Sequence, residues 1–156
     1  MDFGKEANEF IRAARAFEVR LLLIGGGAVN FHGYQRQSPD IDFWIEPTEG
    51  NFAQLAGALR VMGYDVERFP EPVLRAEQNI SLQMSPGLDV EIITFLRPGF
   101  TFNEGWERAL PVVLEDGKGT TVRILSFKDL IESKLKAARP KDLLDVQELK
   151  RRKGLS

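Results

Sequence analysis

The sequence predicts one domain of mixed α and β structure, of the α+β or mixed α/β class, with helices at both ends and a largely β centre. Its 156 residues suffice for one hydrophobic core but not for two. With 43% hydrophobic and 28% charged residues, its composition is that of an ordinary globular protein. Apolar residues recur at helical spacing near both ends, whereas short apolar runs separated by glycine and proline fill the middle.

Helical periodicity and capping signals predict five helices, over residues 5–17, 28–34, 48–62, 126–138 and 140–152. Gly63 is a stop signal for the third of these helices. Ser126 with Asp129 three residues later forms a variant of the capping box, and Pro140 suits the first turn of the last helix.

Apolar and alternating runs predict strands over residues 21–24, 41–45, 80–84, 88–95, 112–114 and 121–125. Pro86-Gly87 and the turn-rich residues 116–119 each stand between two strands, which indicates two hairpins. We therefore expect a single domain over residues 1–156, with a core at about 20–125 and a C-terminal helical part at about 126–152.

Composition argues against several classes of function. The chain has no cysteine, which excludes disulfides, thiolate nucleophiles and zinc fingers and fits a cytoplasmic protein. No segment resembles a signal peptide or a membrane span, so we expect no membrane partner. The net charge of −2 gives no electrostatic signature of general nucleic-acid binding.

A glycine-rich turn follows the first expected strand. Gly25, Gly26 and Gly27 stand between Ile24 and the short helix expected from Ala28. Glycine tolerates the backbone angles of a sharp turn and lets N–H groups approach an anion. A tight strand–helix turn without a ligand explains the pattern equally well. The eight-residue phosphate loop is excluded, because no Gly-Lys-Ser/Thr follows.

Two aspartates stand at the start of the second expected strand. Asp40 and Asp42 are two residues apart, so their side chains point to one face of that strand. Carboxylates held side by side repel each other unless a cation lies between them. Their hard oxygen atoms suit Mg²⁺ or Mn²⁺. A pair of solvated acids at a strand end is the alternative interpretation.

A second pair of acids, Asp89 and Glu91, precedes the apolar residues Ile92 and Ile93. Acids in so apolar a run are costly to bury without a partner. If this strand lies beside the one that carries the two aspartates, a third carboxylate reaches the same metal ions. We prefer Glu91 as that third ligand, with Asp89 as the alternative.

These residues carry a resemblance to a known family. Residues 24–29, 32–36 and 38–42, followed by 91–94, resemble the signature of the nucleotidyltransferase superfamily. That superfamily includes DNA polymerase beta, the CCA-adding enzymes and the aminoglycoside nucleotidyltransferases. The sequence is most similar to small bacterial proteins related to the abortive-infection toxins of toxin–antitoxin systems. The resemblance implies a nucleotidyltransferase-like mixed sheet flanked by helices, with further helices at the C-terminus.

The C-terminal part extends this resemblance over nearly the whole chain. Lys134 precedes an Arg-Pro-Lys-Asp run at 139–142 and Asp145, as in that bacterial group. Two positions depart from the group's pattern. Ser38 replaces a threonine and keeps the hydroxyl, and Glu91 replaces the commoner aspartate with a longer side chain.

The resemblance implies an enzyme that transfers a nucleoside monophosphate from an NTP, such as ATP, to a hydroxyl of tRNA or other RNA, a protein or a small molecule. Asp40, Asp42 and Glu91 are then the catalytic residues and the ligands of two Mg²⁺ or Mn²⁺ ions. The residues expected to bind the nucleotide are Gly25, Gly26, Arg36, Ser38 and Lys134. The enzyme is then the toxin of a toxin–antitoxin pair, with a cognate antitoxin as partner.

Some of these residues have structural alternatives. Arg36 suits an internal ion pair as well as a phosphate, and for Lys134 a surface position is the favoured interpretation. His32 is expected to orient the short helix through a hydrogen bond. Five aromatic side chains are expected in the core rather than as platforms for bases: Trp44, Phe95, Phe100, Phe102 and Trp106.

Two other functions compete with the enzyme. A non-catalytic nucleotide-binding or antitoxin-type module on the same fold is favoured by Glu91 and opposed by the paired aspartates. An interaction protein that dimerises through Phe3, Phe10 and Phe17 is the other, although packing of this stripe on the sheet explains it equally well.

Overall fold

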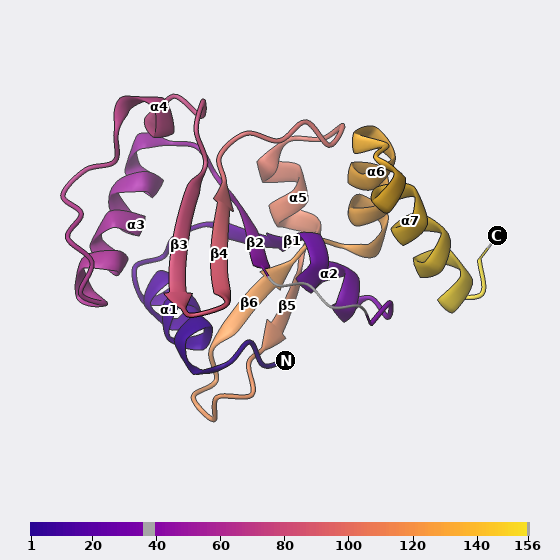
Figure 1. Ribbon diagram of the computed structural model, residues 1–156, viewed down its shortest axis with the longest axis horizontal. Coiled ribbons are helices and arrows are strands. Elements are labelled where there is room, and N and C mark those ends of the chain that lie inside the picture. The colour runs from indigo at the N-terminus through magenta and orange to yellow at the C-terminus, as the bar shows by residue number, and fades with distance from the viewer. Residues whose placement is uncertain (36–39, 156) are drawn as a thin grey trace.

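A six-stranded mixed sheet in the order β3-β4-β2-β1-β6-β5 forms the centre of the protein (Figure 1). The computed structural model describes residues 1–35 and 40–155. The strands are β1 (Leu21–Ile24), β2 (Asp40–Ile45), β3 (Ile80–Ser85), β4 (Leu88–Ile93), β5 (Leu110–Val113) and β6 (Thr121–Ile124). The helices are α1 (Lys5–Ala16), α2 (Gly25–Phe31), α3 (Glu49–Val61), α4 (Glu71–Leu74), α5 (Phe102–Arg108), α6 (Phe127–Ala137) and α7 (Pro140–Arg152).

The strand pairing confirms the expected mixed sheet. β2 lies antiparallel to β1 and parallel to β4, which follows it only after α3, α4 and β3. β3 and β4 form the hairpin expected at Pro86-Gly87, and β5 and β6 form the second hairpin. β1 runs parallel to β6 and thereby joins the two halves of the sheet.

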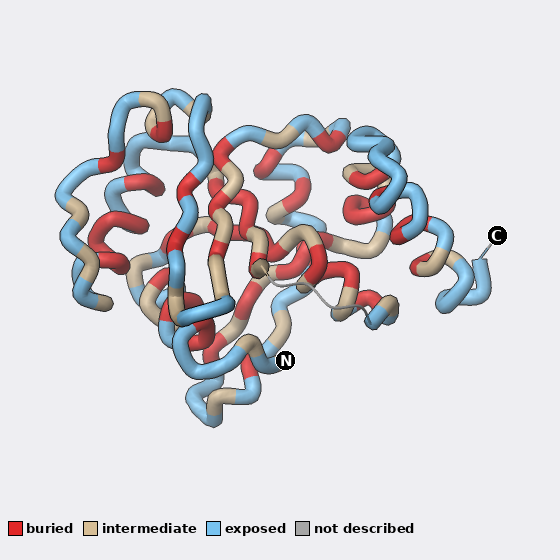
Figure 2. The backbone as a smooth tube through the Cα atoms, in the orientation of Figure 1, coloured by how far each residue is buried: buried red, intermediate tan, exposed pale blue. Residues whose placement is uncertain are grey.

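One face of the sheet carries the larger core. Leu23 and Phe43 are buried on this face, against α1 and α3. Phe10 of α1 lies 5.9 Å from Phe43 between ring centroids, and Leu55 of α3 is fully buried in the same cluster. Figure 2 shows buried residues alternating with exposed ones along these helices, as amphipathic packing requires. The predicted packing of Phe10 on the sheet is confirmed.

The opposite face is covered over only part of its width. Leu22 and Trp44 point to it and pack with α5, where the ring centroids of Trp44 and Phe102 are 5.1 Å apart. Because side chains alternate along a strand, the first residues of β2 on this face are Asp40 and Asp42. Both lie outside the two buried clusters and are partly exposed.

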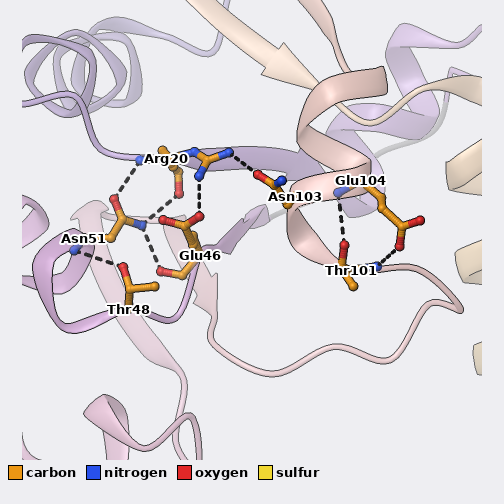
Figure 3. A network of polar contacts seen from close by, with 7 residues as sticks. All are labelled: Arg20, Glu46, Thr48, Asn51, Thr101, Asn103 and Glu104. Atoms are coloured by element: carbon orange, nitrogen blue, oxygen red, sulfur yellow. Dashed lines mark hydrogen bonds and ion pairs between the residues drawn. The ribbon is translucent and has the colours of Figure 1, made fainter.

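A polar network fixes the end of the sheet that lies away from these aspartates (Figure 3). The Asn51 side chain of α3 accepts a hydrogen bond from the Arg20 amide at 2.9 Å and donates one to the Glu46 carbonyl at 2.9 Å. The Arg20 guanidinium pairs with the Glu46 carboxylate and donates to Asn103 of α5 at 2.9 Å. The network therefore ties α3 and α5 to the ends of β1 and of β2, the strand that carries the aspartates.

Most predicted elements are present, with three main differences besides shifts of one to three residues at the ends of elements. The short helix begins at Gly25 rather than at Ala28, so the glycines form its first turn. Neither α4 nor α5 was expected from periodicity. The signal for α5 is its capping box, in which Thr101 and Glu104 exchange backbone–side-chain hydrogen bonds of 3.1 and 2.9 Å.

The start of α6 agrees with the prediction in part. Ser126 accepts a hydrogen bond from the Asp129 amide at 3.1 Å, as expected for an N-cap. The Asp129 carboxylate instead accepts a hydrogen bond from Arg108 at 2.8 Å. No helix within the described ranges combines the length and the apolar character needed to cross a membrane.

Candidate active site

The register of β2 and β4 places the acids side by side. Asp40 lies opposite Asp89, and Asp42 lies opposite Glu91. Residues opposite each other on adjacent strands share a face of the sheet, so all four carboxylates project from the partly open face. The strand neighbourhood that the sequence suggested for Asp40, Asp42 and Glu91 is therefore present in the structure, and Asp89 shares it.

The third carboxylate is directed toward the edge of the sheet. Ser81 of β3, which lies opposite Glu91, donates a hydrogen bond of 2.6 Å from its Oγ to Glu91 Oε1. Across residues 1–35 and 40–155, no three histidine or acidic side chains converge closely enough to hold one metal ion in the observed conformation. In this conformation Glu91 Oε1 is bound to Ser81 of β3, on the other side of β4 from the strand that carries the aspartates.

Gly25 lies directly against Asp42. Its φ of +62° belongs to the left-handed region, and a Cβ on it would lie 2.4 Å from Asp42 Oδ2. Both the backbone conformation and the lack of space require glycine here. The turn thus brings backbone, without a side chain in between, against the carboxylate. Gly26 is buried in the first turn of α2.

The environment of Asp42 disfavours its negative charge. Burial raises the pKa of this carboxyl, and the nearby Asp40 and Glu91 raise it further. Lys141 and Lys134 act in the opposite direction. Burial is thus the largest cause of the raised pKa of Asp42, and repulsion from the acids exceeds attraction to these lysines.

A cleft of about 520 Å³ connects the acids with α6 and α7. It is bounded by Gly25, Asp40 and Asp42 on the sheet side. The opposite wall carries the cationic residues Arg97, Lys134, Lys136, Arg139 and Lys141. A cleft with acids at its floor and cations on its wall is suited to a ligand that carries both a divalent metal and phosphates.

Lys134 is buried, so the favoured interpretation of a surface lysine was wrong. Only 7% of its surface is exposed, and its Nζ lies 2.9 Å from Asp145 and 3.5 Å from Asp142. The two aspartates come from α7, beyond a turn in which Ala138 has a left-handed φ of 54°. That turn reverses the chain and brings the charges together, which the linear spacing did not reveal.

Arg139 is a cleft residue that the sequence analysis did not select. Its Nε donates to Asp142 Oδ2 at 2.7 Å while most of the side chain stays exposed. Burial by itself raises the pKa of Asp142, but the hydrogen bond from Arg139 and the charges of Lys134 and Arg139 outweigh it and lower the pKa. Arg139 and Lys141 belong to the Arg-Pro-Lys-Asp run at 139–142, which resembles the bacterial group. That resemblance was the signal in the sequence for these two residues.

The remaining predicted residues have mixed outcomes. His32 is buried, and its Nε2 lies 2.8 Å from the Leu125 carbonyl, which confirms the expected structural hydrogen bond. Trp44 and Phe102 are buried as expected, but Phe95 is 55% exposed beside Arg97, so its core assignment was wrong. Arg36 and Ser38 lie outside the described residues.

The mixed sheet sets acids on adjacent parallel strands beside a glycine turn, as the resemblance to the nucleotidyltransferase superfamily implies. The chain belongs to the family described as "Nucleotidyltransferase of unknown function (DUF6036)", whose model matches residues 1–155. This membership bears out the family resemblance of the sequence and supports its enzyme class.

Comparison of structures bears on the fold alone. The fold is similar to that in the crystal structure of ANT(2")-Ia in complex with adenylyl-2"-tobramycin, with a TM-score of 0.50 and 17% sequence identity. The similarity covers 92% of this chain and 84% of that chain. A search of curated proteins gave no match.

Proposed function

We propose that this protein transfers a nucleoside monophosphate from an NTP to a hydroxyl group, with release of pyrophosphate. The observation that carries the proposal is the contact of the Asp42 carboxylate with the backbone of Gly25. Asp42 in turn lies opposite Glu91 on the neighbouring strand. It places a carboxylate of the candidate metal site against the backbone on which a triphosphate would lie. Family membership supports the same reaction class.

Each part of the site has a role in this reaction. Gly25 and Gly26 offer close backbone approach to the triphosphate, and Lys134 and Arg139 offset its negative charge from the opposite wall of the cleft. Arg36 and Ser38 are proposed to contact the nucleotide as well. Such a site works by positioning and charge stabilisation, so it requires no covalent protein nucleophile.

The donor set fits Mg²⁺ or Mn²⁺. Asp40 and Asp42 supply oxygen ligands, and the like charges that raise the pKa of Asp42 are relieved by a cation. Glu91 is the third ligand, with Asp89 on the same face as the alternative. When bound, the metal would activate the attacking hydroxyl and stabilise the leaving pyrophosphate.

Acceptor and partner follow from the resemblance rather than from geometry. We propose tRNA, a protein or a small molecule as the acceptor, ATP or another NTP as the donor, and a cytoplasmic toxin with a cognate antitoxin as the biological setting. The cations that line the cleft favour an anionic donor and are compatible with an RNA acceptor.

A non-catalytic nucleotide-binding or antitoxin-type module is the second candidate. The hydrogen bond between Ser81 and Glu91 favours it, because the third ligand is held away from the aspartates. Such a module binds an NTP with a divalent metal but does not consume it. Turnover therefore separates the two candidates.

The test measures binding and turnover with each of the four NTPs and Mg²⁺ or Mn²⁺. If the protein is an enzyme, we expect the metal–NTP pair to raise its thermal unfolding temperature. We also expect release of pyrophosphate when bulk tRNA, a protein mixture or tobramycin is added. Asp42→Asn removes a charge at the site and should abolish both signals. Asp65→Asn makes the same change at an exposed loop position and should leave both unchanged.

The outcomes are distinct. Stabilisation without pyrophosphate on any acceptor contradicts the enzyme and supports the binding module. Equal behaviour of Asp42→Asn and the wild-type protein contradicts the assignment of the site.

A further inference from the structure

Ser81 occupies an unusual position for a residue at the edge of the sheet. On the partly open face, consecutive strands place Ser81 opposite Glu91, Glu91 opposite Asp42 and Asp42 opposite Ile24, which precedes Gly25. This row crosses β3, β4, β2 and β1 in register. Adjacent strands are about 4.8 Å apart, so the serine stands about one strand spacing beyond the third carboxylate.

The Ser81 hydroxyl is both exposed and polarised. Its Oγ donates a hydrogen bond of 2.6 Å to Glu91 Oε1, a short distance typical of a hydroxyl bound to a carboxylate. Leu82 on the other side of the strand is buried in the core, which fixes the direction in which Ser81 points. The backbone of β3 therefore holds this hydroxyl next to Glu91, the carboxylate proposed as the third metal ligand.

We propose that Ser81 is itself a nucleotide acceptor, so that the protein nucleotidylates its own chain at this residue. The inference rests on the proposed function, because it uses the same NTP site. A hydroxyl already placed beside the site has a large advantage over one that must diffuse to it. The Ser81 hydroxyl already has a carboxylate, that of Glu91, in hydrogen-bond contact to take its proton.

The chemical step balances. Ser81 Oγ forms a bond with the α-phosphorus of the NTP, and the bond from that phosphorus to the bridging oxygen of the β-phosphate breaks. Pyrophosphate leaves, and the hydroxyl proton passes along the existing hydrogen bond to Glu91. The product is a nucleoside monophosphate joined to Ser81 by a phosphodiester bond. Glu91 thereby loses its hydrogen-bond donor, and the modified side chain fills the space that another acceptor needs.

The experiment incubates the full chain with each α-labelled NTP and Mg²⁺ or Mn²⁺, without any added acceptor. We expect covalent label on the denatured protein, an increase of one nucleoside monophosphate in the intact mass, and a modified peptide 76–108, released by cleavage after Arg75 and Arg108. Because the reacting groups belong to one chain, the fraction labelled per unit time should not depend on protein concentration.

Three variants locate the acceptor. Ser81→Ala should lose the label, whereas Ser81→Thr, which keeps a hydroxyl, should retain part of it. Ser85→Ala removes the other serine of β3, which lies opposite Leu88 rather than an acid, and should label like the wild-type protein. Ser81 is exposed, so its replacement should leave the thermal unfolding temperature nearly unchanged.

The outcomes separate this inference from the proposed function. If the protein transfers the nucleotide to an added acceptor and releases pyrophosphate but carries no label itself, the inference is overturned and the proposed function stands. Label at another residue, or undiminished label in Ser81→Ala, also overturns it. The absence of metal–NTP stabilisation, label and pyrophosphate together overturns both.

Discussion

At the scale of single residues, the candidate site depends on the absence of a side chain at Gly25. Asp42 Oδ2 occupies the space that a Cβ on Gly25 would take. This packing presses the carboxylate against backbone and contributes to the burial that raises the pKa of Asp42. Gly25 therefore affects both how closely a ligand can approach the turn and the pKa of Asp42.

Gly25→Ala tests this dependence. Alanine in the left-handed region costs about 1–2 kcal/mol, and the clash with Asp42 should add at least about 1 kcal/mol to the loss in free energy of unfolding. Gly117→Ala is the matched control, because its φ is +70° with no atom near the new Cβ. Urea unfolding measures both losses, and thermal shift measures metal–NTP binding, which only Gly25→Ala should lose. Equal losses of stability would show that Asp42 does not restrict position 25.

At the scale of elements, the wall of the cleft is a helix pair joined by buried charge. Lys134 of α6 meets Asp142 and Asp145 of α7, and all three side chains are almost fully buried. Arg139 contacts Asp142 from the exposed side. The pair therefore has two functions: it holds α7 on α6, and it keeps cations facing Asp42. Helix association and site electrostatics depend on the same residues.

Lys134→Met should destabilise the protein by about 3 kcal/mol, because it removes the buried cation that Asp142 and Asp145 share. Chemical denaturation measures this loss. Arg68→Met removes a cation from an exposed pair with Glu71, in which both side chains are more than half exposed, and should cost less than about 1 kcal/mol. A loss for Lys134→Met as small as that of Arg68→Met would mean that the buried pairs do not fix α7.

At the scale of the whole molecule, the sequence predicted which residues share a face better than it predicted which elements are neighbours. The two-residue spacing of Asp40 and Asp42 required a common face whatever the surroundings. The parallel pairing of β2 with β4 depends on long-range packing that no local pattern contains. The burial of Lys134 depends on a turn at Ala138, for which the sequence has no glycine signal.

Missed elements have a local explanation. α5 spans seven residues, too few for a helical period to be recognised, although its capping box was present in the sequence. Phe95 was assigned to the core because it is aromatic, yet it follows the last residue of β4 and lies exposed beside Arg97. Residue type alone does not distinguish the end of a strand from its middle.

The pH dependence of folding should report on one side chain that joins distant parts of the chain. His32 follows α2, and its ring contacts the carbonyl of Leu125, which follows β6. Burial lowers the pKa of His32, the hydrogen bond to Leu125 opposes this shift, and the charge of Lys153 adds to it. The folded protein therefore favours the neutral ring, and because a carbonyl can only accept, Nε2–H donates to it.

A pKa that is lower in the folded state stabilises the protein above the ordinary histidine pKa of about 6.5, and this stabilisation falls as the pH drops below it. Below that pH, His32 binds a proton in the unfolded chain but much less readily in the folded protein. Between pH 7.5 and 5.5 the loss from this residue should reach at most about 1.4 kcal/mol. The raised pKa of Asp42 acts in the opposite direction, because protonation of that carboxyl favours the folded state.

His32→Gln keeps a side-chain N–H and removes the titration. We expect urea unfolding at pH 7.5 and 5.5 to show a smaller loss of stability at the lower pH in His32→Gln than in the wild-type protein. The contribution of Asp42 is common to both proteins and cancels in this comparison. Since His32 is the only histidine in the chain, no second imidazole can mask the difference. Identical losses in the two proteins would mean that His32 takes up its proton in the folded state as readily as in the unfolded one, and that the buried hydrogen bond between α2 and Leu125 does not depend on a neutral ring.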